Sequence, residues 1–467
     1  MASAAEGRSL DVAKFLQGLD FTKFHMRILI LSCLVTFFDG LDFALISYTL
    51  PYIRDEMNLT NEMMGTVSTA AFLGQMIGSL LGSYIADVWG RRPVILVCTV
   101  LSALMTFITG FAQTPEMLFV LRLLGGLAIG GLLAPAWSLN IEAMPPGRRA
   151  TAVTIVMLGF SFGSSAAGPI TNLLAPHFGW HYVFFVCGAL TLMLALVLQF
   201  TLPESARWLV AKGRPKETIV PLLSRFDPTY DSAAHDSYFL SDEKRASAKE
   251  SPVTKFKELF RGWLAYITPL IWVAYFFSSF AIYLKSSFGV LFLEELGMTV
   301  VEATWIGSIS GILGAIAGVF LLSFTEKRGP ALITLAPLFG IPFLLLVGYG
   351  ITMYGDAAFL PVIFIGGILV GAGHAAVISI TSVYYPSAVR ATGGGWASFM
   401  AKFAAVAAPL VGSRYFLGST DAVLDGYLFS AACLGGIIVC ILAMAQFAKR
   451  LKADQDKEEP TAALPAE

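Results

Sequence analysis

The sequence predicts an all-α membrane protein with twelve transmembrane helices in two pseudo-symmetric six-helix bundles. Of its 467 residues, 56% are hydrophobic and only 13% are charged, whereas a soluble domain averages about 25% charged residues. The chain contains twelve apolar runs of the length, about 20 residues, that a membrane helix requires. Backbone polar groups in lipid must be satisfied internally, so we expect these runs to be helices. The sequence lacks the short alternating segments that are typical of a membrane β-barrel.

The predicted spans fall into two groups of six. The first group comprises residues 27–53, 60–86, 93–113, 115–142, 150–174 and 181–202. The second comprises residues 264–293, 300–324, 330–354, 357–384, 392–416 and 423–448. The expected organisation is therefore an N-terminal segment, a first bundle, a polar central loop, a second bundle and a tail, at residues 1–26, 27–202, 203–262, 263–449 and 450–467.

The positions of the basic residues predict the orientation, because cytoplasmic loops of membrane proteins are enriched in Lys and Arg. All but five of the 31 basic residues lie in the N-terminal segment, the central loop, the tail or the loops that follow even-numbered spans. We therefore expect both termini and the central loop to be cytoplasmic, in a multi-pass protein of the inner membrane. Residues 1–27 contain no apolar stretch or cleavage site, so no signal peptide is expected. A short interfacial helix is expected around residues 11–24.

The five exceptional basic residues are Arg54, Arg122, Lys285, Lys402 and Arg414. Two of them, Arg54 and Arg414, lie near the outer ends of spans. The other three lie within spans, where a charge is costly and usually functional.

Two short motifs of the first half recur in the second half, and the number of residues between the two copies is nearly the same for both motifs. Asp87 lies three residues before Gly90 after the second span, and Glu326 lies three residues before a glycine after the eighth span. Arg-Ala-Thr follows the fourth span at Arg149 and the tenth span at Arg390. The halves are therefore expected to be structural repeats, an arrangement that places a solute site near the midplane between them.

Residues 82–92, GSYIADVWGRR, resemble the signature loop of the major facilitator superfamily. Its small residues allow a close approach of helices, and Asp87 and Arg91 are placed to form a charge network that opens in one state. The alternative explanation for the adjacent arginines 91 and 92 is that they only set the topology. The candidate cytoplasmic gate comprises Asp87, Gly90, Arg91, Arg149, Glu326 and Arg390. Two further segments resemble motifs of the superfamily. They are Arg122 with Gly126 and Gly130, and residues 202–209, LPESARWL.

Two segments are similar to one branch of that superfamily, the aromatic acid:proton symporters. Residues 39–42, DGLD, resemble its DGxD motif, and residues 385–397 resemble its YPxxxRxTGxGWA motif. The resemblance covers residues 27–448. It implies the major facilitator fold, alternating access, and proton-coupled import of a small organic anion, with an aromatic carboxylate as the expected substrate. The sequence departs from the branch at His374, where Gln is usual, and at Lys402, where Arg is usual.

Acidic residues in the first span are the main candidates for proton coupling. Asp39 and Asp42 are three residues apart and therefore share a helix face. Acids inside a membrane usually mark a transport pathway, and a structural polar network between helices is the alternative. Arg122 lies at a depth compatible with Asp42, so we expect the two to pair. Glu142, at the cytoplasmic end of the fourth span, is a further candidate, with a loop salt bridge as the alternative.

Cations and aromatic rings in the second half are the candidates for substrate binding. Lys402 lies midway along its span, and Trp396 and Phe399 precede it on the same side. A cation beside rings suits a flat carboxylate, because the charge binds the anion and the rings pack on its face. Pairing of Lys402 with an acid is the alternative. Lys285 and His374 are further candidates, for which snorkelling and an interhelical hydrogen bond are the respective alternatives.

Several classes of protein do not fit the sequence. It contains no nucleophile–base set, metal-ligand cluster or nucleotide loop, so we expect no enzyme activity, cofactor or metal. No basic face suggests nucleic acid binding. The expected partners are a small organic anion, protons and the lipid bilayer, and we expect a monomer. A porter of a non-aromatic metabolite or a sugar-type solute remains the alternative function, although the span 264–293 lacks the run of Gln and Asn typical of sugar porters.

Overall fold

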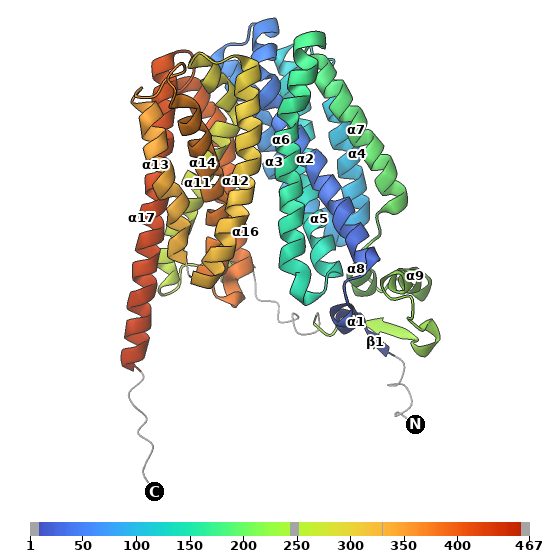
Figure 1. Cartoon of the computed structure of the whole chain (residues 1–467). Helices are drawn as coiled ribbons and strands as arrows, with labels where there is room; N and C mark the ends of the chain where they lie inside the picture. Colours follow the sequence, from blue (N-terminus) through green and yellow to red (C-terminus); the bar gives the residue numbers. More distant parts are fainter. Residues whose placement is uncertain (1–8, 243–251, 329, 459–467) are drawn as a thin grey trace, which may run out of the picture. The chain divides into compact units, whose positions relative to one another are not determined.

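The computed structural model describes residues 9–242, 252–328 and 330–458. Tertiary contacts divide these residues into two compact units. The first contains the described residues up to 242 together with residues 300–312, and the second contains residues 252–299 and the described residues from 313 onward. In Figure 1 the described residues up to 242 are coloured blue to green, and those from 252 onward run from yellow-green to red.

The predicted fold class is confirmed. Among the described residues, eleven helices are long and apolar enough to cross a membrane, and a shorter apolar helical segment, Leu332–Gly348, occupies the ninth predicted position. This segment combines the 3-10 helix η4 (Pro330–Thr334) with α13 (Leu335–Gly348). It is shorter than the predicted span 330–354 because the chain turns at Gly350, whose φ of +67° favours glycine.

The first unit contains six membrane helices in the predicted order. They are α2 (Lys23–Met57), α3 (Asn61–Trp89), α4 (Arg91–Thr109), α5 (Pro115–Ala143), α6 (Arg149–Phe178) and α7 (Trp180–Thr201). Their starts follow ordinary capping rules. The Thr60 side chain accepts a hydrogen bond from the Met63 amide at the start of α3, and Thr114 does the same before Pro115 at the start of α5.

Small residues bring these helices into close contact. A Cβ atom added to Gly126 on α5 would overlap the backbone carbonyl of Ala71 on α3, and one added to Gly163 on α6 would overlap that of Phe37 on α2. Such contacts are the usual packing of membrane helices, where no hydrophobic effect drives association. They fix the rotation of α2 and α5, the helices that carry the candidate coupling residues.

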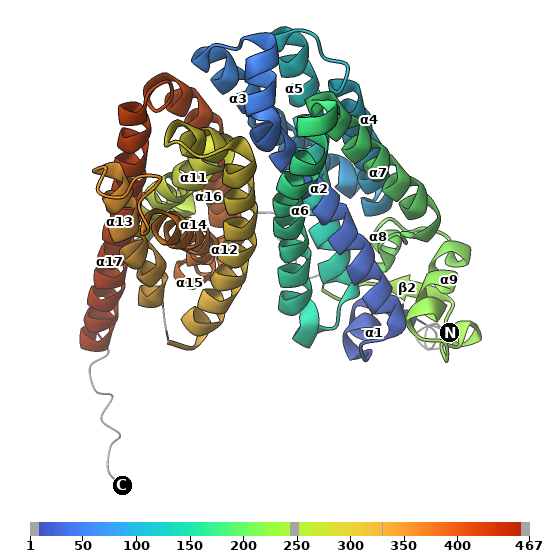
Figure 2. The same cartoon turned by 45° about the horizontal axis from the view of Figure 1, so that its top comes forward.

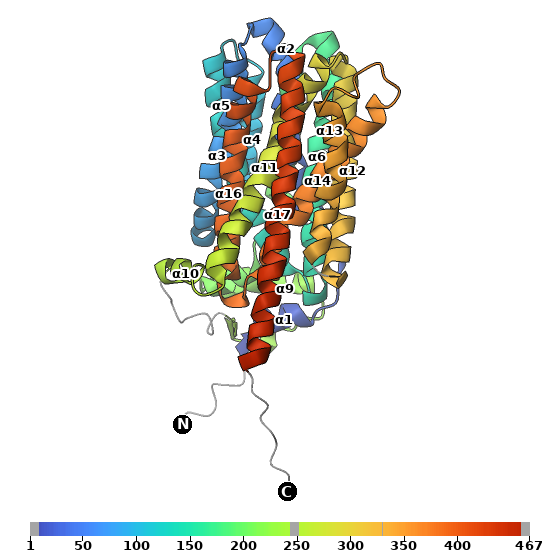
Figure 3. The ribbon, with the colours of Figure 1, turned by 90° about the vertical axis from the view of Figure 1, so that its left-hand side faces the viewer.

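The second unit contains α10 (Pro252–Glu258), α11 (Leu264–Glu295), most of α12 (Val300–Arg328), α13, α14 (Phe359–Ile378), α15 (Ile380–Tyr384), α16 (Ser387–Tyr415) and α17 (Thr420–Glu458). Helix α11 packs on α14, α16 and α17, and α13 packs on α14 and α17. The long α17 faces the viewer in Figure 3. The predicted span 357–384 is divided into α14 and α15 at Ser379.

Segments before α2 and after α7 form a small folded layer, of which the sequence predicted only a short helix within residues 11–24. We call it the loop layer, and it consists of β1 (Ser9–Asp11), α1 (Val12–Gly18), α8 (Ala206–Ala211), α9 (Lys216–Phe226), η2 (Ser232–Ala234) and β2 (Ser237–Phe239). Strands β1 and β2 pair in parallel, with Leu10 opposite Tyr238. Figure 2 shows α1, α8, α9 and β2 gathered at the same end of the first unit.

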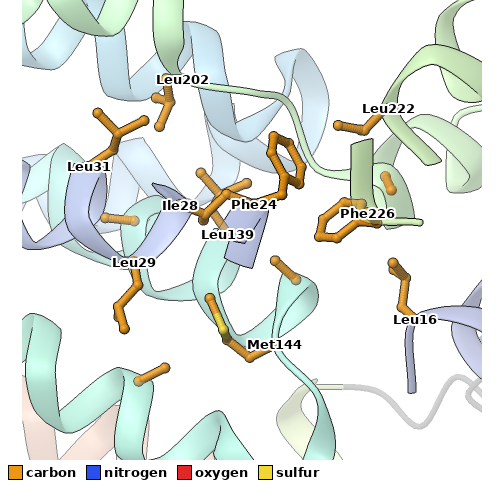
Figure 4. Close-up of a cluster of buried hydrophobic side chains, with 14 of the residues drawn as sticks. Leu16, Phe24, Ile28, Leu29, Leu31, Leu139, Met144, Leu202, Leu222 and Phe226 are labelled. Carbon is orange, nitrogen blue, oxygen red and sulfur yellow. The ribbon is translucent and has the colours of Figure 1, made fainter. Parts of the chain in front are cut away.

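The loop layer shares a hydrophobic core with the membrane helices (Figure 4). Leu16 of α1 and Leu222 and Phe226 of α9 belong to the same buried cluster as Phe24 and Ile28 of α2. The Phe226 ring lies edge-on to Phe24, with ring centroids 4.7 Å apart. The layer is therefore an extension of the first unit rather than a solvated loop.

Phe226→Ala should detach α9 from α2. Removing a buried aromatic ring typically costs about 3–5 kcal/mol, and Phe226 is 3% exposed. We expect faster proteolytic cleavage within residues 203–242 of the detergent-solubilised protein. Glu217→Ala, on the exposed side of the same helix, is the control and should cleave like the unmodified protein. Equal cleavage of both variants would show that α9 is not held by this core.

Candidate functional site

A buried ion pair in the first unit is the centre of the candidate site. Asp42 of α2 is 4% exposed and Arg122 of α5 is 2% exposed. The Arg122 Nη1 atom lies 3.3 Å from Asp42 Oδ1. The expected pairing of these two residues is therefore present in the structure.

Three more side chains complete the surroundings of the pair. The Thr106 hydroxyl of α4 donates to Asp42 Oδ1. Arg122 Nη2 donates to Thr109 Oγ1 at 3.0 Å, and the guanidinium lies 5.1 Å from the centroid of the Phe184 ring of α7. Thr106 and Thr109 are three residues apart on α4 and so share a face. Four helices thus contribute to one buried charge cluster.

Asp39 lies one turn before Asp42 on α2. Its side chain is also buried, at 3% exposure. Both acids of α2 therefore lie in the interior of the first unit, and Asp42 is paired with Arg122 as expected.

A second polar network lies at the loop-layer end of the first unit. Arg91 Nη2 lies 3.2 Å from Asp87 Oδ1 and 3.0 Å from Glu142 Oε1. Glu142 also accepts a hydrogen bond from the Ser205 hydroxyl. Glu142 therefore belongs with the gate candidates Asp87 and Arg91, and the structure does not bring it together with Arg122.

Glu204, in the motif at residues 202–209, is a further member of this network, and its role was not predicted from the sequence. Its carboxylate accepts from the Arg91 amide at 3.0 Å and from the Arg92 amide at 3.2 Å, at the start of α4. A carboxylate is favourable there because amide groups are unsatisfied at a helix N-terminus. Burial raises the pKa of Glu204, against the opposing effects of these amides and of the Arg91 charge.

Gly90 connects α3 to α4 beside this carboxylate. Its φ of 113° and ψ of 161° lie in a region that is essentially restricted to glycine. A Cβ atom at this position would also overlap the Glu204 carboxylate. Both the backbone conformation at this position and the proximity of Glu204 therefore require glycine.

The two Arg-Ala-Thr motifs have the same local geometry. Arg149 Nε donates to the carbonyl of Met144 at 3.1 Å, and Arg390 Nε donates to that of Tyr385 at 3.2 Å. Each arginine thus reaches the carbonyl five residues earlier, as expected for a structural repeat. The side chain of Glu326, the remaining gate candidate, lies outside the described residues.

The substrate candidates all lie in the second unit. Lys285 Nζ of α11 donates to the carbonyl of Gly367 on α14 at 2.9 Å. His374 Nδ1 of α14 lies 3.0 Å from Ser278 Oγ of α11. Both side chains therefore link α11 to α14.

Lys402 is half-buried on α16. The Trp396 and Phe399 rings lie 5.7 Å apart, and each side chain is 39% exposed. Trp396 also contacts Phe256 of α10 and Trp272 of α11, at centroid distances of 4.8 and 5.9 Å. Trp396 therefore belongs to an aromatic cluster that the sequence did not predict.

Apolar helices of this length, with ionisable groups buried inside them, define a polytopic membrane transport protein. The sequence profile of the Major Facilitator Superfamily matches residues 32–409. The chain therefore belongs to this superfamily, whose members are transporters and not enzymes.

Curated relatives match nearly the whole chain. The 4-hydroxybenzoate transporter PcaK of Pseudomonas putida is 29% identical, over 94% of this chain and 97% of its own. The gallate transporter of Pseudomonas putida is 28% identical, over 86% and 88%. The benzoate transport protein of Acinetobacter baylyi is 26% identical, over 86% of each chain. These relatives confirm the resemblance to transporters of aromatic acids.

Solved structures share the fold at low sequence identity. A D-xylose-proton symporter superposes with a TM-score of 0.69 at 18% identity, over 91% of this chain and 98% of the other. A bacterial homolog of the human lysosomal transporter Spinster, inward-facing and unoccupied, gives 0.68 at 18% identity, over 92% and 95%.

Gly90→Ala should destabilise the protein more than Gly213→Ala. Both glycines have positive φ, but a Cβ at Gly213 would meet no neighbour within 4 Å. Alanine at Gly213 should cost about 1–2 kcal/mol for the left-handed backbone. At Gly90 a strain of about 1–3 kcal/mol is added to the displacement of Glu204 from α4. The measurement is the thermal unfolding midpoint in detergent, and equal shifts would contradict the role assigned to Glu204.

Proposed function

We propose that this chain imports a small organic anion, an aromatic carboxylate, together with protons by alternating access. The observation that carries the proposal is the buried pair of Asp42 and Arg122 within a superfamily of transporters. The relatives named for 4-hydroxybenzoate, gallate and benzoate support the substrate class. We also propose a monomer in the inner membrane, with both termini and the central loop cytoplasmic, since the basic residues gather in these segments.

The proposed coupling uses the charge of Asp42. A buried ion pair loses the solvation of both charges, and only a close partner with good hydrogen bonds compensates for that loss. Protonation of Asp42 removes the partner of Arg122 and leaves the guanidinium with Thr109 and Phe184. The stability of the packed arrangement of α2, α4 and α5 therefore depends on whether a proton is bound. Asp39 is a second buried acid beside this pair, and we propose that it contributes to the same pathway.

The proposed substrate contact is Lys402. It is a cation midway along α16, and an anion that leaves water needs a charge-assisted hydrogen bond to replace its hydration. Trp396 and Phe399 lie on the same helix and offer aromatic faces, and His374 and Lys285 are further candidates in the same unit.

The proposed cytoplasmic gate is the network at the loop-layer end. Asp87, Arg91 and Glu142 join α3, α4 and α5 there. The other gate candidates are Arg149 in the same half, and Glu326 and Arg390, which correspond to Asp87 and Arg149 in the second half. The Asp87 side chain is 73% exposed, and exposed ion pairs are weak, so its pair with Arg91 can break without a large cost.

Transport of a non-aromatic metabolite or sugar-type solute is the second candidate function. The fold alone does not separate the two, because a D-xylose-proton symporter has the same fold. Competition for uptake by benzoate, 4-hydroxybenzoate and D-xylose distinguishes them.

Asp42→Asn should abolish accumulation of labelled 4-hydroxybenzoate in proteoliposomes with an inward proton gradient. An amide resembles the protonated acid but cannot release a proton, so counterflow exchange at equal pH should persist. Asp55→Asn, at an exposed acid of the same helix, is the control and should accumulate normally. Normal accumulation by Asp42→Asn would assign Asp42 a structural role. Accumulation that a protonophore leaves unchanged would contradict proton coupling itself.

Lys402→Ala should weaken binding of the aromatic acid about tenfold or more, because a charge-assisted hydrogen bond contributes about 1.5–3 kcal/mol. Binding of the neutral amide analogue should be spared, which controls for loss of folding. Lys402→Arg should retain part of the affinity for the acid. The measurement is a binding titration in detergent with both ligands. If the affinity for the acid does not change in Lys402→Ala, Lys285 and Arg122 become the next candidates.

A further inference from the structure

The two oxygens of the Asp42 carboxylate have different surroundings. Oδ1 accepts from the Thr106 hydroxyl and from Arg122 Nη1. Oδ2 is buried and has no hydrogen-bond partner among the residues that the structure describes. A buried acceptor without a partner is costly, and a proton would be bound most easily at this oxygen.

The hydroxyl of Thr106 has two acceptors within reach. It lies within hydrogen-bond distance of Asp42 Oδ1 and 2.9 Å from the carbonyl oxygen of Ser102, one turn earlier on α4. A hydroxyl carries a single hydrogen, so it can donate fully to only one acceptor at a time. The choice depends on which oxygen is the stronger acceptor, and a charged carboxylate is stronger than a neutral carbonyl.

We propose that Thr106 is a positioning residue for the proton on Asp42. While Asp42 is charged, Thr106 donates to Oδ1 and the incoming proton forms its O–H bond at Oδ2. Once the carboxyl is neutral, the hydroxyl of Thr106 turns toward the Ser102 carbonyl. Release of the proton breaks the same O–H bond, and Thr106 keeps its own hydrogen throughout. This inference rests on the proposed proton coupling through Asp42.

Few other charged or titratable groups surround Asp42 in the described structure. Arg122 of α5 is paired with it, Cys187 of α7 interacts with it electrostatically, and Asp39 lies one turn away on α2. The charged residues of α3 and α6 lie at the ends of these helices. Cys98 of α4 interacts with Asp39 instead. The Thr106 hydroxyl is therefore one of only two donors that the described structure places on this carboxylate.

Loss of the hydroxyl should favour the protonated form of Asp42. The hydrogen bond from Thr106 is stronger when the carboxylate is charged than when it is neutral. Thr106→Val removes it with little change in shape, so the charged form loses more stability than the neutral form. Proton release on the inner side would then require a higher internal pH.

The test measures the initial rate of 4-hydroxybenzoate uptake into proteoliposomes against internal pH, at a fixed external pH. In Thr106→Val the midpoint should move upward by roughly one pH unit. Thr106→Ser, which keeps the hydroxyl, should restore the original midpoint. Thr99→Val is the matched control, because Thr99 is equally buried on α4 and donates only to the Ile95 carbonyl in the described structure. It should keep the original midpoint.

Counterflow exchange at equal pH separates this effect from misfolding, since exchange does not require proton release. Thr106→Val should retain exchange while its pH profile shifts. An unchanged pH profile in Thr106→Val, with accumulation abolished in Asp42→Asn, would overturn the role of Thr106 and leave the proposed function intact. A shift of equal size in Thr99→Val would also overturn it. Uptake independent of the proton gradient in the unmodified protein would instead overturn the proposed function.

Discussion

The burial of one carboxylate and one guanidinium constrains the architecture of the first unit. Each charge loses several kcal/mol of solvation in a low-dielectric interior, so Asp42 and Arg122 are stable only where donors and acceptors converge. That convergence requires α2, α4, α5 and α7 to approach closely. Gly188 of α7 and Gly131 of α5 permit the approach to α4, because Phe107 and Cys98 of α4 occupy the space that a side chain would need. The buried charge cluster therefore depends on the close packing of these helices.

Helix α5 connects this cluster to the loop-layer end of the unit. It carries Arg122 in its first half and Glu142 near its last residue. At 1.5 Å per residue the two side chains are about 30 Å apart along the axis. A shift of α5 that loosens the pair with Asp42 therefore also moves Glu142 relative to Arg91. This shared helix gives a physical route by which a bound proton can affect the proposed gate.

The sequence predicted the features that depend on local composition and spacing. The apolar spans, the paired acids of α2 and the partner of Asp42 could be found in this way. Thr106 could not be found, because a threonine in an apolar run has no distinguishing pattern until the rotation of α4 is known. Most of the loop layer was missed for a related reason: β1 pairs with β2 across most of the first unit's sequence, and short polar segments carry no signal for such a distant partner.

The distribution of charge inside the two units supports different tasks for them. The interior of the first unit carries Asp39, Asp42 and Arg122, an excess of acid that suits a proton. The sequences of α13, α14 and α16 contain no acidic residue, and those of α11 lie at its last two positions. Lys285 and Lys402 are the lysines of these helices, and Lys285 donates to the Gly367 carbonyl of α14. This distribution agrees with the proposal that the organic anion binds in the second unit and the proton in the first.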